Sequence, residues 1–199
     1  MAKLRRKGKT RSAALMLICC EGAETEIQYF GAWAQEYPRV KVSIFSPPNN
    51  ASAPSHLVDE IKSKMREHRF EAGDQAWLVL DEDRWQGKQR SNLHQQIKSA
   101  KLQEVRSNPC FELWLLAHFE PIGTPLKKAQ AVARLRHNLG GFNSANLNMP
   151  AFLTRVNLAV ANAQAVDTNQ GVQPGVTRVY RLMHAIAELI APARLDGQA

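Results

Sequence analysis

Two short apolar segments that end in carboxylates constrain the fold of this chain more than any other feature. Leu15–Cys20 runs directly into Glu21, and Trp77–Leu80 runs directly into the acidic triplet Asp81–Asp83. Continuous apolar runs of this length are typical of strands that are buried on both faces of a parallel sheet. In such sheets, ligands and catalytic groups collect at the carboxyl ends of the strands. We therefore expect the two acidic ends to lie together, although they are far apart in the sequence.

Predicted strands and helices alternate along the chain up to residue 120. Short apolar runs and apolar residues at helical spacing predict strands over 13–20, 40–45, 75–80 and 102–106, and helices over 25–37, 57–65 and 93–100. The polar stretch 81–90 is predicted to be a loop. The repeated strand–helix order predicts an α/β fold with a small, mostly parallel sheet flanked by helices.

A further helix is predicted to start at Asn108-Pro109, because Asn caps exposed backbone N–H groups and Pro suits the first helical position. This helix continues to Phe119. Beyond Pro121 the pattern predicts helices alone, over 126–139, 151–165 and 177–190, and Gly140 closes the first of them. The predicted organisation is a flexible basic arm (1–12), an α/β core (13–120) and an all-helical extension packed on that core (121–199).

The composition is that of a soluble globular domain. Hydrophobic residues make up 44% of the 199 residues, and no apolar run approaches the roughly 20 residues that span a bilayer. The apolar stretch near the N-terminus ends at Glu21 without a small-residue cleavage site, so we expect no secretory signal and a cytoplasmic location. The three cysteines lack CxxC or His-pair spacing, which favours free core thiols over a disulfide framework or a zinc site.

The net charge of +8 is concentrated at the N-terminus. The first eleven residues carry +6 and no acid, which leaves +2 for the rest of the chain. These basic residues are Lys3, Arg5, Arg6, Lys7, Lys9 and Arg11. They either contact the phosphates of a nucleic acid or form a solvated terminus, and the sequence favours neither interpretation.

The acidic triplet has the spacing of a magnesium site. If the chain is still extended there, Asp81 and Asp83 point to one side, and Glu82 points to the other. Mg²⁺ is usually held by one or two carboxylates together with water and phosphate oxygens. The alternative is that the triplet is an ordinary solvated loop.

Glu21 lies between a buried strand and a helix, where partial burial raises the pKa of a carboxyl group and suits it to proton transfer. The alternative is an interaction with the N-terminal dipole of the next helix, which Glu24 or Glu26 would provide equally well. Gly22 allows the backbone to turn tightly or to approach a phosphate closely.

A third cluster lies at the predicted junction around Asn108. Glu112 stands one turn inside an otherwise apolar helix, where it either completes or supports the metal site or faces solvent. His118 is more simply a structural residue than a catalytic one. The chain has no GxxxxGK[ST], GxSxG or HExxH motif. A phosphatase of the haloacid dehalogenase type is disfavoured, because Trp85 stands where its pattern has Thr or Val.

Together these clusters resemble blocks of the RloB-like family, small bacterial proteins that are related to TOPRIM nucleases. Members lie beside an AAA-type ATPase in restriction and abortive-infection loci. The resemblance covers about Lys3 to Glu120 and rests on the basic arm and on three blocks in the same order, ICCEGAETEIQYF, WLVLDEDRW and SNPCFELWLLAHF. The helical C-terminal part matches only loosely.

The resemblance implies a TOPRIM-like fold and site, in which Glu21 is the general acid or base and Asp81 and Asp83 are Mg²⁺ ligands. It extends a site role, less directly, to Glu112 and to the neighbouring Asn108. Topoisomerase activity is not expected, because the chain is too short for the strand-passage domains.

The resulting hypothesis is a nuclease dependent on Mg²⁺ or Mn²⁺ that cleaves RNA or DNA and acts with an ATPase partner in anti-phage defence. Candidate phosphate contacts are Gly22, Arg5, Arg6, Lys7 and Lys9, and candidate supporting residues are Asn108 and His118. One alternative is a non-catalytic module with a TOPRIM-like fold that binds nucleic acid or a partner protein. Nucleotidyl transfer of the primase kind is the least favoured.

Overall fold

The computed structural model of the chain describes residues 14–36, 41–45, 54–82, 87–123 and 125–190. Up to residue 107, strands and helices alternate in the order β1 (Leu15–Cys20), α1 (Thr25–Glu36), β2 (Lys41–Phe45), α2 (Pro54–Glu67), β3 (Gln75–Asp81), α3 (Gly87–Ser99) and β4 (Gln103–Ser107). Helices follow: α4 (Glu112–Ala117), α5 (Lys128–Leu139), α6 (Met149–Leu153), α7 (Val156–Val166) and α8 (Val179–Ile190). The predicted α/β class is confirmed.

The four strands form one sheet in the order β2-β1-β3-β4, and every pairing is parallel. The chain leaves β1 toward one edge of the sheet, to form β2, and then crosses back to place β3 on the other side of β1. The strand order therefore reverses between β1 and β3. In open α/β sheets, a crevice for ligands forms at such a reversal, outside the carboxyl ends of the two strands.

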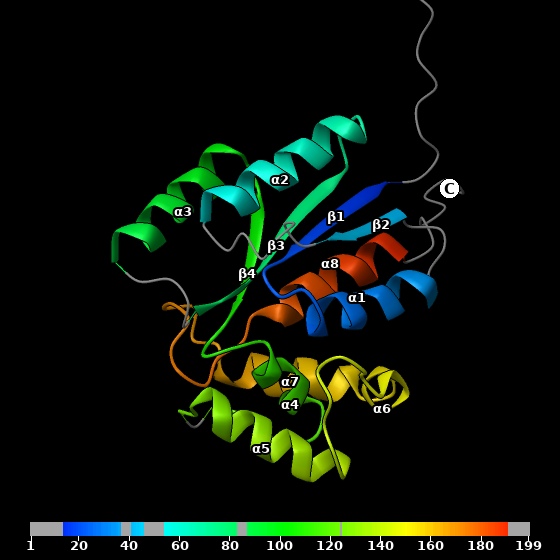
Figure 1. Ribbon diagram of the computed structural model, residues 1–199, viewed down its shortest axis with the longest axis vertical. Helices are drawn as coiled ribbons and strands as arrows, with labels where there is room; N and C mark the ends of the chain where they lie inside the picture. The colour runs from blue at the N-terminus through cyan, green and yellow to red at the C-terminus, as the bar shows by residue number, and fades with distance from the viewer. Residues whose placement is uncertain (1–13, 37–40, 46–53, 83–86, 124, 191–199) are drawn as a thin grey trace, which may run out of the picture.

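Helices cover both faces of the sheet, as the continuous burial of its strands requires. All six residues of β1 are fully buried, and successive side chains point to opposite faces. Leu15, Leu17 and Cys19 pack in a cluster with apolar residues of α2 and α3, whereas Met16 and Ile18 belong to a larger cluster on the opposite face. Figure 1 shows α2 and α3 on one side of the sheet, α1 and α8 on the other, and α4 to α7 grouped beyond α1 and α8.

The larger cluster contains residues from both sides of position 120. Met16 and Ile18 of the sheet share it with Ala159 of α7 and with Leu182 and Ile186 of α8. The helices after residue 120 thus bury apolar surface in common with the sheet. The predicted boundary between core and extension at residue 120 stays a prediction.

The prediction of free cysteines is confirmed, since Cys19, Cys20 and Cys110 are all buried and unlinked. Across the part of the chain that the structure describes, no helix has the length and apolar character needed to cross a membrane.

Some predicted helix boundaries were wrong. The predicted loop 81–90 is shorter, because α3 already begins at Gly87. The predicted helix 151–165 is broken into α6 and α7. The Thr154 hydroxyl donates to Pro150 O (3.2 Å) and the Arg155 guanidinium donates to Ala151 O (2.8 Å). These side chains bond to carbonyl groups of α6 where that helix ends.

Asn108 is not a helix cap. The helix α4 begins at Glu112, and Asn108 instead pairs with the segment before α8: its backbone N–H donates to Val176 O (2.9 Å) and its side-chain amide donates to Val172 O (2.9 Å). The Asn108–Pro109 peptide bond is cis. The predicted start of the last helix at Thr177 was also wrong: Thr177 forms an antiparallel bridge with Ser107, and α8 begins at Val179.

Candidate active site

A pocket of about 310 Å³, here called the acidic pocket, lies at the carboxyl ends of β1 and β3. The loop after β1, the first turn of α1, the end of β3, the start of α4 and two segments beyond residue 120 all contribute to it. Its lining residues are Gly22, Ala23, Glu24, Thr25, Glu26, Asp81, Phe111, Glu112, Lys128 and Ser144. The pocket thus forms at the reversal of strand order, where the topology favours a ligand site.

The structure brings Glu21 and Asp81 together, although 60 residues separate them. The backbone N–H of Glu21 donates to Val79 O (3.1 Å), so the pairing of β1 with β3 continues one residue beyond β1. The backbone N–H of Asp81 then donates to Glu21 Oε2 (3.0 Å). This hydrogen bond fixes the Glu21 carboxylate beside the end of β3.

Asp81 is strongly perturbed by its surroundings. Its side chain is buried, and burial raises the pKa of this carboxyl group to about 8, with further contributions from the charges of Glu26, Glu21 and Glu112. Lys128 opposes the shift. Between about pH 4 and pH 8, Asp81 therefore keeps a proton that an ordinary aspartate has released. Perturbed groups of this kind in a cleft are candidates for a functional site.

Glu26 is a site residue that the sequence did not single out. It lies in the first turn of α1 with only 6% of its surface exposed, and burial raises its pKa, with a smaller contribution from Glu112. Its carboxylate rests against Gly22, where an added Cβ would overlap the carboxylate atoms. The glycine therefore makes room for Glu26. The signal in the sequence was the position of Glu26 in the turn that follows an acidic strand end.

Glu112 lines the acidic pocket, so it does not simply face solvent. It begins α4, its side chain is 12% exposed, and its Oε2 lies 3.7 Å from Nζ of Lys128. Lys128 comes from α5, in the predicted extension, and its charge lowers the pKa of both Glu26 and Asp81. This lysine was missed, because helical spacing predicts where α5 runs but gives no indication of which residue reaches the pocket.

The other candidate supporting residues lie away from the acidic pocket. Asn108 contacts the segment before α8, as described above. His118 is fully buried, with its ring nitrogens 3.1 Å from Tyr29 Oη and 3.0 Å from Trp114 O. Burial lowers the pKa of His118 to about 4, so the ring is neutral at physiological pH. Its contacts are those of a structural core residue.

Several candidates cannot be placed. Asp83 and the basic residues Arg5, Arg6, Lys7 and Lys9 lie outside the described residues. Glu82 is described, and it is buried in ion pairs with Arg90 and Arg106. Glu82 does not line the acidic pocket, whereas its neighbour Asp81 does.

The acidic pocket offers oxygen donors, which suit a hard divalent cation such as Mg²⁺. Within the described ranges, no group of three or more His, Cys, Asp or Glu side chains has the arrangement of a complete metal site. Mg²⁺ does not need such a cage, because one or two carboxylates and water usually hold it. Neighbouring acids raise the pKa of Asp81, and a bound cation would relieve that repulsion. The donor chemistry therefore fits the ion.

Comparison with known proteins gives one match. A family model described as RloB-like protein matches residues 16–186, which include every described residue of the acidic pocket. Among the curated proteins and the solved structures, none matches the chain.

Proposed function

The chain belongs to the RloB-like family, and from this premise we propose that it is a metal-dependent phosphodiesterase that cleaves RNA or DNA. One observation carries the proposal. Carboxylates from the end of β3 and from the starts of α1 and α4 line a single pocket at the point where the strand order reverses, and Glu21, at the end of β1, is bonded to the backbone of Asp81 beside it. Clustered acids of this kind destabilise one another unless a cation or a proton is bound.

In this proposal Glu21 moves a proton to or from the attacking or leaving oxygen. Its Oε2 already accepts a hydrogen bond from the backbone of Asp81, which fixes its orientation. A carboxylate with a fixed orientation beside the pocket suits the role of a general acid or base. Burial raises the pKa of the nearby Glu26, which favours the protonated form of that carboxyl group.

Asp81 and Glu112, together with Asp83, would hold Mg²⁺ or Mn²⁺. When bound, such an ion supplies positive charge that stabilises the charge developing on the attacked phosphate. Lys128 adds a cation from α5, 3.7 Å from the Glu112 carboxylate, where it neutralises part of the acidic charge and attracts an anionic substrate.

The test is cleavage of labelled RNA and of plasmid DNA by the full chain in the presence of Mg²⁺ or Mn²⁺. Glu21→Gln and Asp81→Asn should each lower the cleavage rate by at least about 100-fold, in line with the usual contribution of a positioned acid or base. The matched control is Glu188→Gln, which removes a carboxylate from an exposed position on α8. If both site variants keep the activity of the control, the proposed roles are wrong.

The family resemblance also suggests the biological setting. We propose that the protein acts in the cytoplasm with an AAA-type ATPase partner in anti-phage defence. Co-purification of the chain with an AAA-type ATPase from the same locus would test this part separately. A chain that binds RNA or DNA but cleaves neither, with or without that partner, would instead support the non-catalytic binding module.

A further inference from the structure

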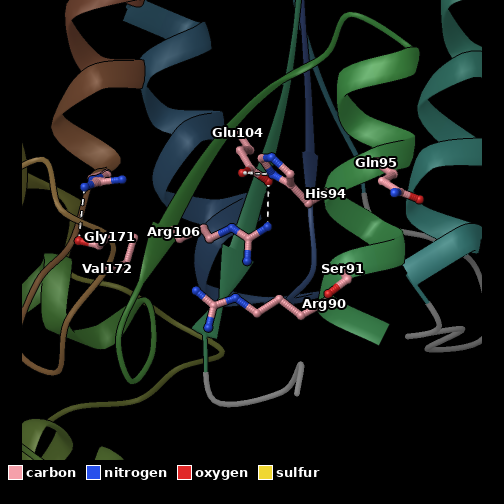
Figure 2. A pocket seen from close by; sticks show the side chains of 9 residues that line it. Arg90, Ser91, His94, Gln95, Glu104, Arg106, Gly171 and Val172 are labelled. Atoms are coloured by element: carbon pink, nitrogen blue, oxygen red, sulfur yellow. Dashed lines mark hydrogen bonds and ion pairs between the residues drawn. The ribbon is translucent and has the colours of Figure 1, made fainter. Parts of the chain in front are cut away.

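A second pocket, of about 490 Å³, lies between α3, β4 and the segment before α8. It is here called the arginine pocket, and its lining residues are Arg90, Ser91, His94, Gln95, Glu104, Arg106, Gly171, Val172 and Arg178. Figure 2 shows the guanidinium groups of Arg90 and Arg106 close together, with side chains of α3 on one side and Gly171 and Val172 on the other. Nothing in the proposed cleavage mechanism uses this pocket.

A single carboxylate holds two of the arginines. Glu82 is only 7% exposed, and its Oε2 lies 3.2 Å from Nη1 of Arg106, while its Oε1 pairs with Nη2 of Arg90. Arg106 also donates from Nη2 to Glu104 Oε2 (2.8 Å). The buried Glu82 carboxylate therefore fixes both guanidinium groups in place, and Arg106 is held by Glu104 as well.

The third arginine is fixed from the opposite wall. Arg178 makes a fork-like contact with Asp167, through Nε (3.2 Å) and Nη2 (3.0 Å) to Oδ1, and Nη2 also donates to Gly171 O (3.1 Å). The Asp167 side chain is 1% exposed, and Asp167 does not line the pocket. The contacts that anchor Arg178 thus lie behind it.

Donors remain available on the open side of these arginines. Within the described residues, Nη1 of Arg178 and both Nε and Nη1 of Arg90 have no hydrogen-bond partner. Among the lining side chains, the three arginines face one carboxylate, Glu104, which is already paired with Arg106. Fixed, converging guanidinium groups with unused N–H donors match the oxygens of a phosphate group.

The two pockets are linked by consecutive residues. Asp81 lines the acidic pocket, and Glu82, the next residue, anchors Arg90 and Arg106 in the arginine pocket. The end of β3 therefore separates an acidic pocket from a basic one. A nucleic-acid chain carries a phosphate at every nucleotide, so a bound strand offers more than one phosphate to this side of the molecule.

We propose that the arginine pocket binds a phosphate group, carried either by a nucleic-acid chain or by a free nucleotide. Its volume lies in the range of pockets that hold small ligands, so it has room for more than a bare anion. This inference does not require that the protein cleaves its ligand. Its failure and the failure of the proposed cleavage are therefore separate results.

The experiment measures binding of a short 5′-fluorescein-labelled single-stranded RNA to the full chain by fluorescence anisotropy, in EDTA so that no cleavage occurs. Unlabelled AMP is titrated in a parallel series by calorimetry. The test variant is Arg90→Gln, because the Arg90 side chain is 50% exposed and its loss leaves the Glu82–Arg106 pair in place. Lys98→Gln is the matched control, since Lys98 is exposed on the same helix but does not line the pocket.

Arg90→Gln should weaken binding about five- to tenfold and should reduce the slope of log Kd against log salt concentration for RNA by about one. Lys98→Gln should change the Kd less than about twofold. A loss confined to RNA identifies a nucleic-acid chain as the source of the phosphate, and a loss for AMP identifies a nucleotide. The proposal is overturned if Arg90→Gln binds both probes as the wild type does. It is equally overturned if Lys98→Gln loses as much affinity, because that result indicates non-specific attraction.

Discussion

Replacing Asp81 by Asn should change how the stability of the protein depends on pH. The pKa of Asp81 is raised from an ordinary value of 3.8 to about 8, mainly by burial and then by the charges of Glu26 and Glu21. Between these two values the folded protein keeps a proton that the unfolded chain has released. The stabilising effect of that proton is complete below about pH 4 and is lost as the pH rises through about 8.

The magnitude follows from the size of the pKa difference. One proton difference between the folded and unfolded states changes the free energy of unfolding by about 1.4 kcal/mol per pH unit. Between pH 5 and pH 8 the wild-type protein should therefore lose about 3–4 kcal/mol relative to Asp81→Asn. The amide is nearly isosteric with the carboxyl group and carries no charge, so the variant lacks this dependence.

Urea unfolding of both proteins in metal-free buffer at pH 5, 6, 7 and 8 measures the difference directly. The stability of Asp81→Asn minus that of the wild type should rise steadily with pH, and Mg²⁺ added at pH 8 should stabilise the wild type more than the variant. A difference that stays constant within about 1 kcal/mol would refute the reasoning. It would mean that the carboxyl group is ionised throughout and that the neighbouring acids do not repel it.

Two further substitutions test other parts of the structure. Gly22→Ala should destabilise the protein by about 1–3 kcal/mol and lower any cleavage activity, because the added methyl group displaces the buried Glu26 carboxylate. The control is Gly31→Ala in α1, where the added methyl group meets nothing within 4 Å and should stabilise the protein by up to about 1 kcal/mol. Equal effects of the two substitutions on thermal unfolding would contradict this assignment. His118→Gln should leave the cleavage rate per folded molecule unchanged. In the wild type, His118 stays neutral in the folded protein while it is protonated in the unfolded chain, so the free energy of unfolding should fall by about 1.4 kcal/mol per pH unit as the pH drops from 6.5 to about 4. His118→Gln should abolish this contribution in urea unfolding. A variant with the same slope as the wild type would show that His118 is not neutral.

The sheet and one edge of the acidic pocket could be predicted because local patterns determine them. Continuous apolar runs made β1 and β3 recognisable, and the parallel order placed Glu21 and Asp81 at the same edge. The boundary at Asn108 was wrong because a local capping signal was overridden by distant partners, Val172 and Val176. Hydrogen bonds between residues more than 60 positions apart leave no pattern in the sequence around Asn108.

The remaining members of the pocket depend on tertiary packing. Glu26 resembles an ordinary acidic residue in a first helical turn, and only its burial against Gly22 distinguishes it. Lys128 and Ser144 reach the pocket from segments that follow the sheet in the sequence. The side chain of Glu82 was correctly predicted to point away from Asp81. Its ion-pair partners could not be predicted, because Arg90 and Arg106 come from α3 and β4.

The contribution of Lys128 and Ser144 has a consequence for how this protein can be divided or recombined. The carbonyl group of Ser144 also accepts hydrogen bonds from Thr25 (3.4 Å) and Gln28 (2.9 Å) of α1, and the backbone N–H of Leu147 donates to Gln28 (3.0 Å). An N-terminal fragment that stops at residue 120 would lack this wall of the acidic pocket. A chimera that takes residues 121–190 from a relative would inherit that relative's wall, so the two parts must vary in concert and cannot be exchanged as independent modules.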